Sequence, residues 1–406
     1  MLVIGGGAAG MMCAVTAARL GVNVTVLERN EKIGRKLYIT GKGRCNVTNC
    51  SDGEEFNRNL VTNARFLYSA LSRFNSYDTM DFFASAGVEL KVERGNRVFP
   101  QSDKSADIID ALRREAVRAG VRIVVDCRVQ TLTFEDNHFV AKTNLGDYED
   151  DKVVIATGGV TYPATGSTGD GYAFAKSFGH TIVEPVGALV GLRCVGTSQL
   201  AGLTLKNVRV AIERVGKEIC SEFGEMLYTH TGVSGPTILT ISSRINRLHS
   251  DGLMLAVDLK PAVSQDELDE RLRETLSGNN KQLVNAVHDY LPKALIDSWL
   301  HNAAVDPRKP ANSVTKEERM RLAKALKRFT YTVEGLEPID GAVVTAGGVS
   351  VKEVDPKTME SKLQKGLYFA GEVLDVDALT GGFNLQIAFA TGYTAAYFAA
   401  KKEKDV

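Results

Sequence analysis

The most constraining feature of this sequence is a glycine-rich turn near its N-terminus. Gly5, Gly7 and Gly10 form a G-x-G-x-x-G pattern between a short apolar run and an Ala-rich stretch, and the next apolar run, VNVTVLE, ends at Glu28. This succession predicts a strand, a turn, a helix and a second strand, which together make a βαβ unit. Side-chain-free glycines admit a pyrophosphate to the helix N-terminus, and the carboxylate accepts hydrogen bonds from ribose hydroxyls. The unit therefore predicts a bound dinucleotide.

Two later segments indicate that this dinucleotide is FAD. The apolar run KVVIATGG predicts a strand that ends at Ala156, Thr157 and Gly158, and Gly382 precedes an Ala-rich helix that begins near Phe383. A flavin ring needs more protein surface than an ADP group does. A helix N-terminus aimed at its pyrimidine edge would also stabilise the negative charge of the reduced form. We therefore expect three distant segments to meet on one FAD molecule.

Along the rest of the chain the pattern of strand-like and helix-like segments changes several times, which predicts more than one domain. Strand and helix patterns alternate at both ends, whereas the middle holds short β-rich runs separated by glycines and polar turns. Within this middle part lies a helical stretch with two Ser/Thr-x-x-Glu capping boxes. We expect a nucleotide-binding domain in 1–184 and 341–406, a β-rich domain in 185–263 and 328–340, and a helical subdomain in 264–327.

The composition argues against several classes of protein. Lys plus Arg and Asp plus Glu both number 49, so the formal net charge is zero and no overall field favours nucleic acid or anionic lipid. Six cysteines without a secretory pattern favour a reducing compartment. We find no apolar stretch of the roughly 20 residues that cross a bilayer, and the histidines lack metal-ligand spacing. We expect a cytoplasmic protein that binds a small-molecule substrate, without nucleic acid, membrane or metal; the sequence does not define its oligomeric state.

Four long motifs, taken together, resemble those of the BaiN/YhiN-like bacterial flavoproteins. They are GRKLYITGKGRCNVTN, TGSTGDGYAFA, YTHTGVSGP and GLYFAGEVLDVDALTGGFN, and they extend in the same order across nearly the whole chain. That family includes enzymes described as aminoacetone oxidases and bile-acid enone reductases. The resemblance implies an α/β fold: a split, Rossmann-like FAD domain of the two-dinucleotide-binding type, an inserted β-rich, barrel-like domain, and a helical subdomain over the active-site entrance.

The resemblance, together with the glycine segments, also implies which residues contact FAD. The N-terminal turn would hold the ADP half, the basic loop that follows would lie near the pyrophosphate, ribityl chain or ring, and the last helix would offer N–H groups to the flavin. The predicted cofactor contacts are Gly5, Gly7, Ala8, Ala9, Gly10, Glu28, Arg29, Lys36, Thr40, Gly41, Arg44, Cys45, Asn46, Val129, Ala156, Thr157, Gly158, Gly371, Glu372, Asp375, Gly382, Phe383, Asn384 and Leu385.

The candidate catalytic residues come from two motifs. His230 lies in YTHTGVSGP, a loop that by resemblance faces the flavin, and an imidazole serves as acid or base near neutral pH. A lone histidine is more often structural, so this alternative stays open. Thr231 and Tyr162 are the further candidates.

These observations predict an FAD-dependent oxidoreductase that carries out two-electron hydride transfer at flavin N5 on a small organic substrate. The first candidate is an amine, as in an aminoacetone-type oxidase, with O2 reoxidising the flavin. The alternative is an enone reductase, for which NAD(P)H is the candidate reductant. No residue in the sequence selects the amine over the enone.

Two further alternatives come from particular segments. Cys45 and Cys50 have the C-x4-C spacing of a flavin-dependent dithiol enzyme, but the sequence after Gly158 lacks the second nucleotide fingerprint that such an enzyme needs. The helical stretch 264–327 would be the partner surface if FAD were a structural ligand of a non-catalytic interaction protein. We retain both as alternatives to the oxidoreductase.

Overall fold

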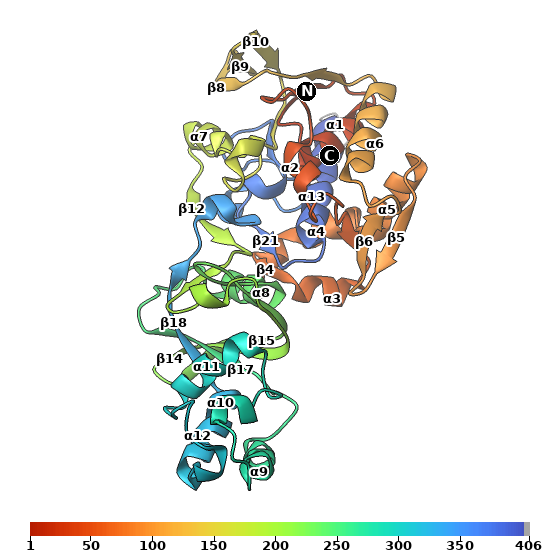
Figure 1. Cartoon of the computed structure of the whole chain (residues 1–406). Coiled ribbons are helices and arrows are strands. Elements are labelled where there is room, and N and C mark those ends of the chain that lie inside the picture. Colours follow the sequence, from red (N-terminus) through yellow and green to blue (C-terminus); the bar gives the residue numbers. More distant parts are fainter. Residues whose placement is uncertain (402–406) are drawn as a thin grey trace. The chain divides into compact units, whose positions relative to one another are not determined.

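The computed structural model describes residues 1–401 and consists of two compact units. Unit 1 contains Met1–Ala188 together with the chain from Pro338 onwards, and unit 2 contains Leu189–Glu337 (Figure 1). Both described ends of the chain therefore belong to unit 1. Residues 402–406, the end of the predicted second part of the FAD domain, lie outside the described residues.

Unit 1 is built on a five-stranded parallel sheet. Its inner strands have no exposed residue, as expected for a parallel sheet that is covered on both faces. Parallel pairing brings the carboxyl ends of neighbouring strands to one edge, where nucleotides bind in folds of this type. The strand order is β20 (Leu367–Phe369), β11 (Val153–Ile155), β1 (Leu2–Ile4), β2 (Thr25–Leu27) and β7 (Arg122–Val124).

The last helix of the chain packs against the first helix. Helix α13 (Phe383–Ala400) contacts α1 (Ala8–Arg19), and Figure 1 shows its blue ribbon among red and orange N-terminal elements. The approach is close, because a Cβ at Gly392 would lie 2.3 Å from the carbonyl oxygen of Ala9. Helix α13 is apolar around most of its circumference, which suits a helix buried inside a unit.

Smaller sheets and helices complete unit 1. Strands β8, β9 and β10 form an antiparallel meander, whereas the preceding strand β7 joins the parallel sheet. The remaining elements are α2 (Arg35–Ile39), β3 (Thr48–Asn49), α3 (Gly53–Arg58), β4 (Leu60–Thr62), α4 (Ala64–Arg73), α5 (Ser76–Ser85), β5 (Leu90–Glu93), β6 (Arg97–Pro100), α6 (Ser105–Arg118), β8 (Val129–Glu135), β9 (His138–Thr143), β10 (Gly146–Asp150), α7 (Asp170–Ser177), β12 (Ile182–Ala188), β19 (Val344–Val349) and β21 (Asp377–Ala378).

Unit 2 is a closed β-barrel with helices that share its hydrophobic core. The fully buried Trp299 illustrates the packing, since its indole Nε1 donates to the carbonyl oxygen of Leu322 at 3.0 Å. The predicted α/β fold class with an inserted barrel is confirmed, while a separate helical subdomain stays a prediction. The barrel order is β13 (Leu192–Cys194), β16 (Gly232–Ser234), β15 (Lys217–Tyr228), β14 (Thr204–Arg214), β17 (Leu253–Asp258) and β18 (Phe329–Leu336), and the helices are α8 (Pro236–Ile245), α9 (Gln265–Leu276), α10 (Leu283–Ala286), α11 (Lys293–Asn302) and α12 (Lys316–Lys327).

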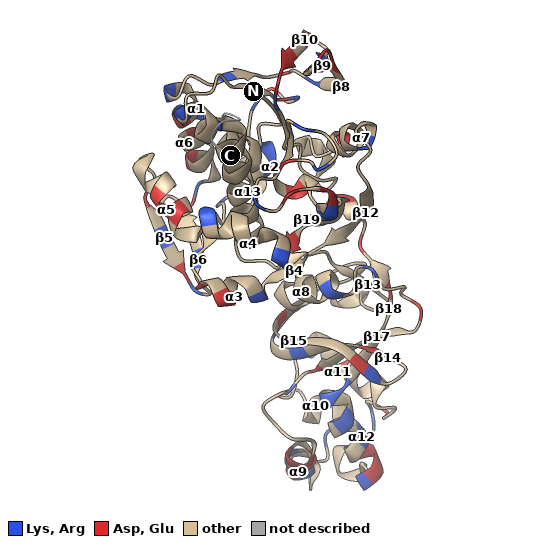
Figure 2. Cartoon of the chain, turned by 180° about the vertical axis from the view of Figure 1, so that it is seen from behind, with Lys and Arg blue, Asp and Glu red and all other residues tan. Residues whose placement is uncertain are grey.

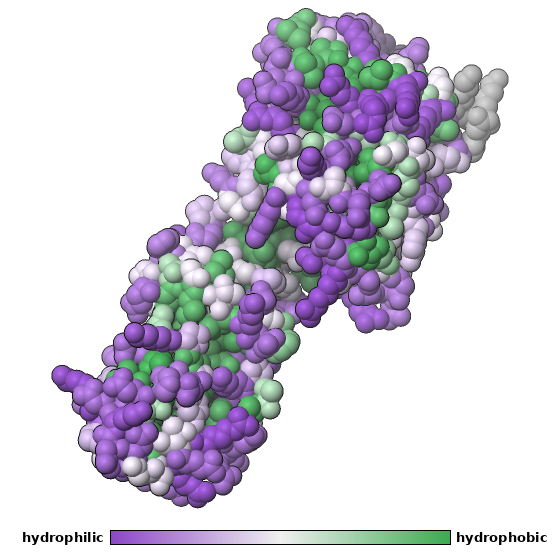
Figure 3. Space-filling model, turned by 45° about the vertical axis from the view of Figure 1, so that its right-hand side comes forward, coloured by the Kyte–Doolittle hydropathy of each residue, from purple (hydrophilic) through white to green (hydrophobic). Residues whose placement is uncertain are grey.

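The face of the chain seen in Figure 3 is largely polar, with apolar areas set among hydrophilic ones. Large apolar side chains are exposed on both units, for example Tyr38 in unit 1 and Phe223 in unit 2. None of the helices within residues 1–401 is long and apolar enough to cross a membrane.

A buried polar network fixes the position of α13. The amide oxygen of Gln386 accepts hydrogen bonds from the hydroxyls of Thr48 and Thr79, each at 2.7 Å. Its amide nitrogen donates to the carbonyl oxygen of Phe74 at 2.9 Å. Gln386 and both threonines are fully buried. Because each partner comes from a different segment, the network anchors α13 to the N-terminal half of unit 1.

We predict that Gln386→Leu destabilises unit 1 by about 3 kcal/mol, because two hydroxyls and one carbonyl group are left buried without this partner. Hydrogen exchange of peptides covering 383–400 is the measurement, and faster exchange of these amides is the expected result. Gln265→Leu, at an exposed position at the start of α9, is the control and leaves the exchange unchanged. Equal protection of α13 in Q386L and in the native chain would contradict the prediction.

Candidate cofactor site

The glycine turn leads from β1 into α1 and leaves the start of this helix open. A Cβ at Gly10 would lie 1.9 Å from the carbonyl oxygen of Gly5, so only glycine permits this approach of helix to turn. Gly7 is the N-cap of α1, and as a glycine it has no side chain to accept a hydrogen bond from the helix amides. A Cβ at Gly7 would meet nothing within 4 Å. Open space at Gly7, beside an uncapped first turn, is what an anion site at a helix N-terminus requires.

Glu28 lies at the end of β2, directly beside this turn. Its Oε2 accepts a hydrogen bond from the amide of Gly6 at 2.7 Å, and its Oε1 accepts from the amide of Asn30 at 2.8 Å and from the Asn30 side chain at 2.6 Å. The residue is only 6% exposed. The contact of Glu28 with the ribose stays a prediction.

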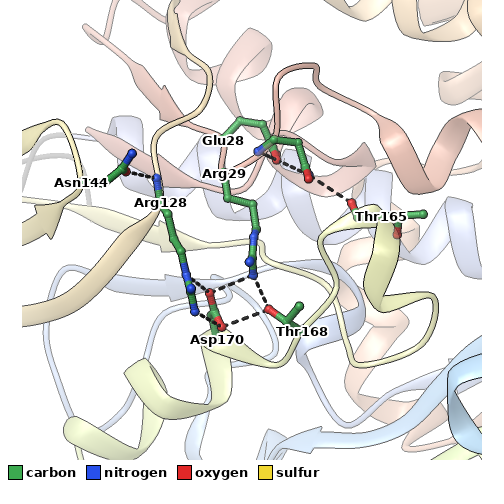
Figure 4. Close-up of polar contacts among 8 residues, drawn as sticks. Glu28, Arg29, Arg128, Asn144, Thr165, Thr168 and Asp170 are labelled. Carbon is green, nitrogen blue, oxygen red and sulfur yellow. Dashed lines mark hydrogen bonds and ion pairs between the residues drawn. The ribbon is translucent and has the colours of Figure 1, made fainter.

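Arg29, the next residue, belongs to a charged cluster (Figure 4). Its guanidinium donates to Thr168 and, at 3.1 Å, to Asp170, which also accepts from Arg128 at 3.3 Å. Asp170 opens α7, but the N-cap of that helix is Gly169, so the aspartate binds arginines rather than capping the helix. The cluster connects the end of β2 with the chain on either side of the β8–β10 meander.

The segment after β11 lies against the glycine turn. A Cβ at Gly5 would be 2.5 Å from the carbonyl oxygen of Ala156, so these two predicted contact segments meet in the structure. The hydroxyl of Thr157 and the side-chain oxygen of Asn46 are buried without a hydrogen-bond partner among residues 1–401. Buried polar atoms of this kind fit a cofactor that carries many hydrogen-bonding groups, as FAD does.

The start of α13 provides the third predicted segment. The first intrahelical bond runs from the amide of Gln386 to Gly382 at 3.1 Å, so the amides of Phe383, Asn384 and Leu385 have no acceptor within the helix. The side chain of Asn384 is engaged elsewhere, because it both accepts from the Ala378 amide at 3.0 Å and donates to the Ala378 carbonyl oxygen at 2.7 Å. The backbone amides of this turn are therefore the groups that we assign to the cofactor, and the Asn384 side chain is not.

Lys36 and Glu372 form an ion pair beside these segments. The ammonium nitrogen of Lys36 lies 2.7 and 2.9 Å from the two carboxylate oxygens of Glu372, and it also donates to the hydroxyl of Thr161 at 2.7 Å. The amide of Thr345 donates to the same carboxylate at 2.8 Å. Sequence analysis did not identify Thr161 or Thr345, and no local motif marks either residue.

In the basic loop after α2, the side chains of Arg44 and Thr40 bind other residues of unit 1. The guanidinium of Arg44 donates from Nε to Asp103 at 2.8 Å, binds Glu93, and lies 4.2 Å from the centre of the Phe99 ring. Hydrogen bonds to Glu93 and Asp103 raise the pKa of Arg44, and the bond from Arg44 lowers the pKa of Glu93. The pKa of Asp103 is lowered by hydrogen bonds from Lys91 and then Arg44. Thr40 donates to the carbonyl oxygen of Lys36 at 3.0 Å. The assignment of Arg44, with Thr40 and Gly41, to the cofactor stays a prediction.

Cys45 is fully buried, whereas Cys50 is half-buried, and both are free thiols. Burial raises the pKa of the Cys45 thiol, which disfavours the thiolate that dithiol exchange requires. The geometry therefore gives no support to the dithiol alternative.

Val129 and Asp375 occupy different places around the parallel sheet. Val129 begins β8, two residues after Cys127, whose amide donates to the carbonyl oxygen of Glu28 at 2.9 Å. Asp375 accepts from the side chain of Asn63 at 2.7 Å through its backbone oxygen and at 2.9 Å through its carboxylate. Both remain predicted contacts of the adenine edge and the ribityl chain.

The candidate catalytic residues do not all lie in one unit. Tyr162 belongs to unit 1, where its amide donates to the carbonyl oxygen of Asp340 at 3.1 Å. His230 and Thr231 lie exposed between β15 and β16 of unit 2, and Thr231 donates to Glu337. Their catalytic roles stay predictions. Within residues 1–401, no group of three or more His, Cys, Asp or Glu side chains has an arrangement that could hold a metal ion.

The parallel sheet, the glycine turn and the acidic strand end define a Rossmann-type nucleotide-binding domain, the fold class of many FAD-dependent oxidoreductases. Residues 1–398 match the family described as HI0933-like protein Rossmann domain, and the chain belongs to this family. It is 34% identical to a 3-dehydro-bile acid delta(4,6)-reductase from Clostridium scindens, over 98% of each protein. It is 32% identical to a ribosomal RNA dihydrouridine synthase from Haemophilus influenzae, over 97% of each. The predicted family and enzyme class are thereby confirmed.

Solved structures show the same fold at low sequence identity. A 3-ketosteroid delta1-dehydrogenase from Sterolibacterium denitrificans matches with a TM-score of 0.53 and 13% identity, over 98% of each chain. A 3-ketosteroid-delta4-(5alpha)-dehydrogenase from Rhodococcus jostii matches with a TM-score of 0.50 and 17% identity, over 99% of this chain and 96% of that one. At these identities the likeness establishes the fold alone.

The expected exclusion of nucleic acid is not supported. A second relative, 31% identical over 97% of this chain, is also named a ribosomal RNA dihydrouridine synthase, in this case from Escherichia coli. The exclusion rested on a net charge of zero, which sums over the chain and says nothing about one surface. Figure 2 shows basic and acidic residues interspersed over both units.

We predict that Gly7→Ala weakens FAD binding at least tenfold without lowering the melting temperature of the FAD-free protein. The added methyl group fits the protein but occupies the space proposed for the pyrophosphate. Fluorescence titration of the FAD-free protein measures the affinity. Gly53→Ala is the matched control, because Gly53 also starts a helix and its Cβ would meet nothing within 4 Å. Unchanged FAD affinity in G7A would contradict this placement of the pyrophosphate.

Proposed function

We propose that this chain is an FAD-dependent reductase of carbon–carbon double bonds conjugated to a carbonyl group. The observation that carries the proposal is the pair of activities in the names of its relatives. A delta(4) bond in a 3-dehydro steroid is conjugated to the ketone, and dihydrouridine is uridine with the C5–C6 bond, conjugated to the C4 carbonyl, saturated. Both names therefore describe the same change in different molecules, and they favour the reductase over the amine oxidase.

The reaction adds a hydride to the β-carbon and a proton to the α-carbon, and NAD(P)H is the proposed donor of the two electrons. FAD, when bound, would supply the hydride chemistry. The chain would contribute binding through the helix N-termini of α1 and α13, together with Glu28. Tyr162, His230 and Thr231 are the proposed sources of the proton.

Anaerobic rapid mixing tests the proposed reaction. We expect NADH or NADPH to bleach the flavin absorbance, and a 3-oxo-delta(4) steroid or a uridine-containing RNA to restore it on a catalytic timescale. The two acceptors are separate arms, and the one that restores the absorbance identifies the substrate class. An amine that bleaches the flavin while neither acceptor restores it would overturn the proposal in favour of the oxidase.

We predict that His230→Asn slows the acceptor half-reaction about 100-fold, the usual size of a positioned proton donor's contribution. Bleaching by NAD(P)H remains at its native rate, because that half-reaction needs no proton on the substrate carbon. Tyr162→Phe tests the second candidate in the same way. His249→Asn, at an exposed position of unit 2, is the control. Native acceptor rates in both H230N and Y162F would remove these two residues from the mechanism.

A further inference from the structure

Glu372 follows Gly371, which packs against the first turn of α1 and the second turn of α13. A Cβ at the preceding residue, Gly371, would be 2.7 Å from the Cβ of Ala9 in α1 and 3.8 Å from the Cβ of Ala388 in α13. The amide of Gly371 also donates to the hydroxyl of Thr391 in α13 at 2.9 Å. The carboxylate of Glu372 lies beside Gly158, a residue that we assign to the cofactor, since a Cβ at Gly158 would be 3.9 Å from its Oε2.

A carboxylate at this position is electrostatically unexpected. Helix N-termini carry partial positive charge and favour anions, and the proposed ligand has an anionic pyrophosphate and an anionic reduced flavin. The fixed carboxylate of Glu372 would repel both the pyrophosphate and the reduced flavin. The side chain of Glu372 is 21% exposed, so solvent screens its charge only partly.

Lys36 compensates this charge. Its ammonium contacts both carboxylate oxygens of Glu372, so each group is the counter-ion of the other. Thr161 and the amide of Thr345 complete the hydrogen bonds of the pair. The two side chains together contribute no net charge to the cofactor segments.

We propose that the Lys36–Glu372 pair sets the charge experienced by bound FAD and thereby its affinity and its ease of reduction. Lys36 and Glu372 act here as positioning residues for the cofactor. The inference rests on the assignment of FAD to this site but requires no particular substrate. It differs from a purely structural role, because we expect removal of the ammonium and removal of the carboxylate to change FAD affinity in opposite directions.

The test is a double-mutant cycle on the FAD-free full chain, titrated with FAD. Glu372→Gln leaves the ammonium uncompensated, and we expect it to bind FAD about tenfold more tightly. Lys36→Met leaves the carboxylate uncompensated and binds FAD about tenfold more weakly. The double variant returns to within about threefold of the native affinity, because it removes both charges.

The second readout is the midpoint potential of the bound flavin. An uncompensated ammonium favours the anionic reduced form, so the potential rises in E372Q and falls in K36M. A tenfold change in the ratio of reduced to oxidised affinity corresponds to about 30 mV for a two-electron couple. A shift of both single variants in the same direction would overturn the inference.

The matched control is the pair Lys309–Glu318 in unit 2. It has the same N–O distance of 2.7 Å, and its side chains are 25% and 18% exposed, against 25% and 21% for Lys36–Glu372. Lys309→Met and Glu318→Gln leave the FAD affinity unchanged. Melting temperatures of the FAD-free variants separate loss of folding from loss of binding.

The outcomes also distinguish this inference from the proposed reaction. If the native chain binds no FAD, the cofactor assignment itself fails. If it binds FAD and both single variants bind more weakly, with no recovery in the double variant, the pair is structural and only this inference fails. Substrate activity enters neither measurement.

Discussion

The packing of the last helix against the first is the contact on which the rest of unit 1 depends. Helix α13 approaches α1 so closely that Gly392 cannot carry a side chain, and Gln386 ties the same helix to three segments of the N-terminal half. Because α13 begins with unbonded amides, its placement also decides where these N–H groups lie relative to the glycine turn. The packing of α13 therefore determines both the fold of unit 1 and the position of the N–H groups that we assign to the cofactor.

Each of the acidic side chains at the site has hydrogen-bond donors of its own. Glu28 is held by backbone amides, Asp170 by two arginines, and Glu372 by Lys36. Each carboxylate thus has its own partner, although the nucleotide to be bound is itself anionic. In the proposed site, acidic side chains would orient ribose and ribityl hydroxyls while the helix N-termini retain their attraction for phosphate.

The names of two relatives describe the same kind of reduction in two very different molecules. A steroid and a ribosomal uridine share a double bond conjugated to a carbonyl group, and a flavin reduces such a bond in the same way in either molecule. Under the function proposed for this chain, its choice of substrate would depend on the surfaces that admit the acceptor. Net charge, the only global property the sequence offered on this question, does not report on them.

The sequence by itself determined the βαβ unit around Gly5, Gly7 and Gly10, the acidic strand end at Glu28, and through four motifs the family and the FAD cofactor. These are local patterns, readable because strand, turn and helix starts are set by neighbouring residues. Only the tertiary structure decided that Lys36 pairs with Glu372, 336 positions away, and that the β7 run leaves the meander for the parallel sheet. Such pairings depend on how distant segments pack, and no local preference of either segment encodes its partner.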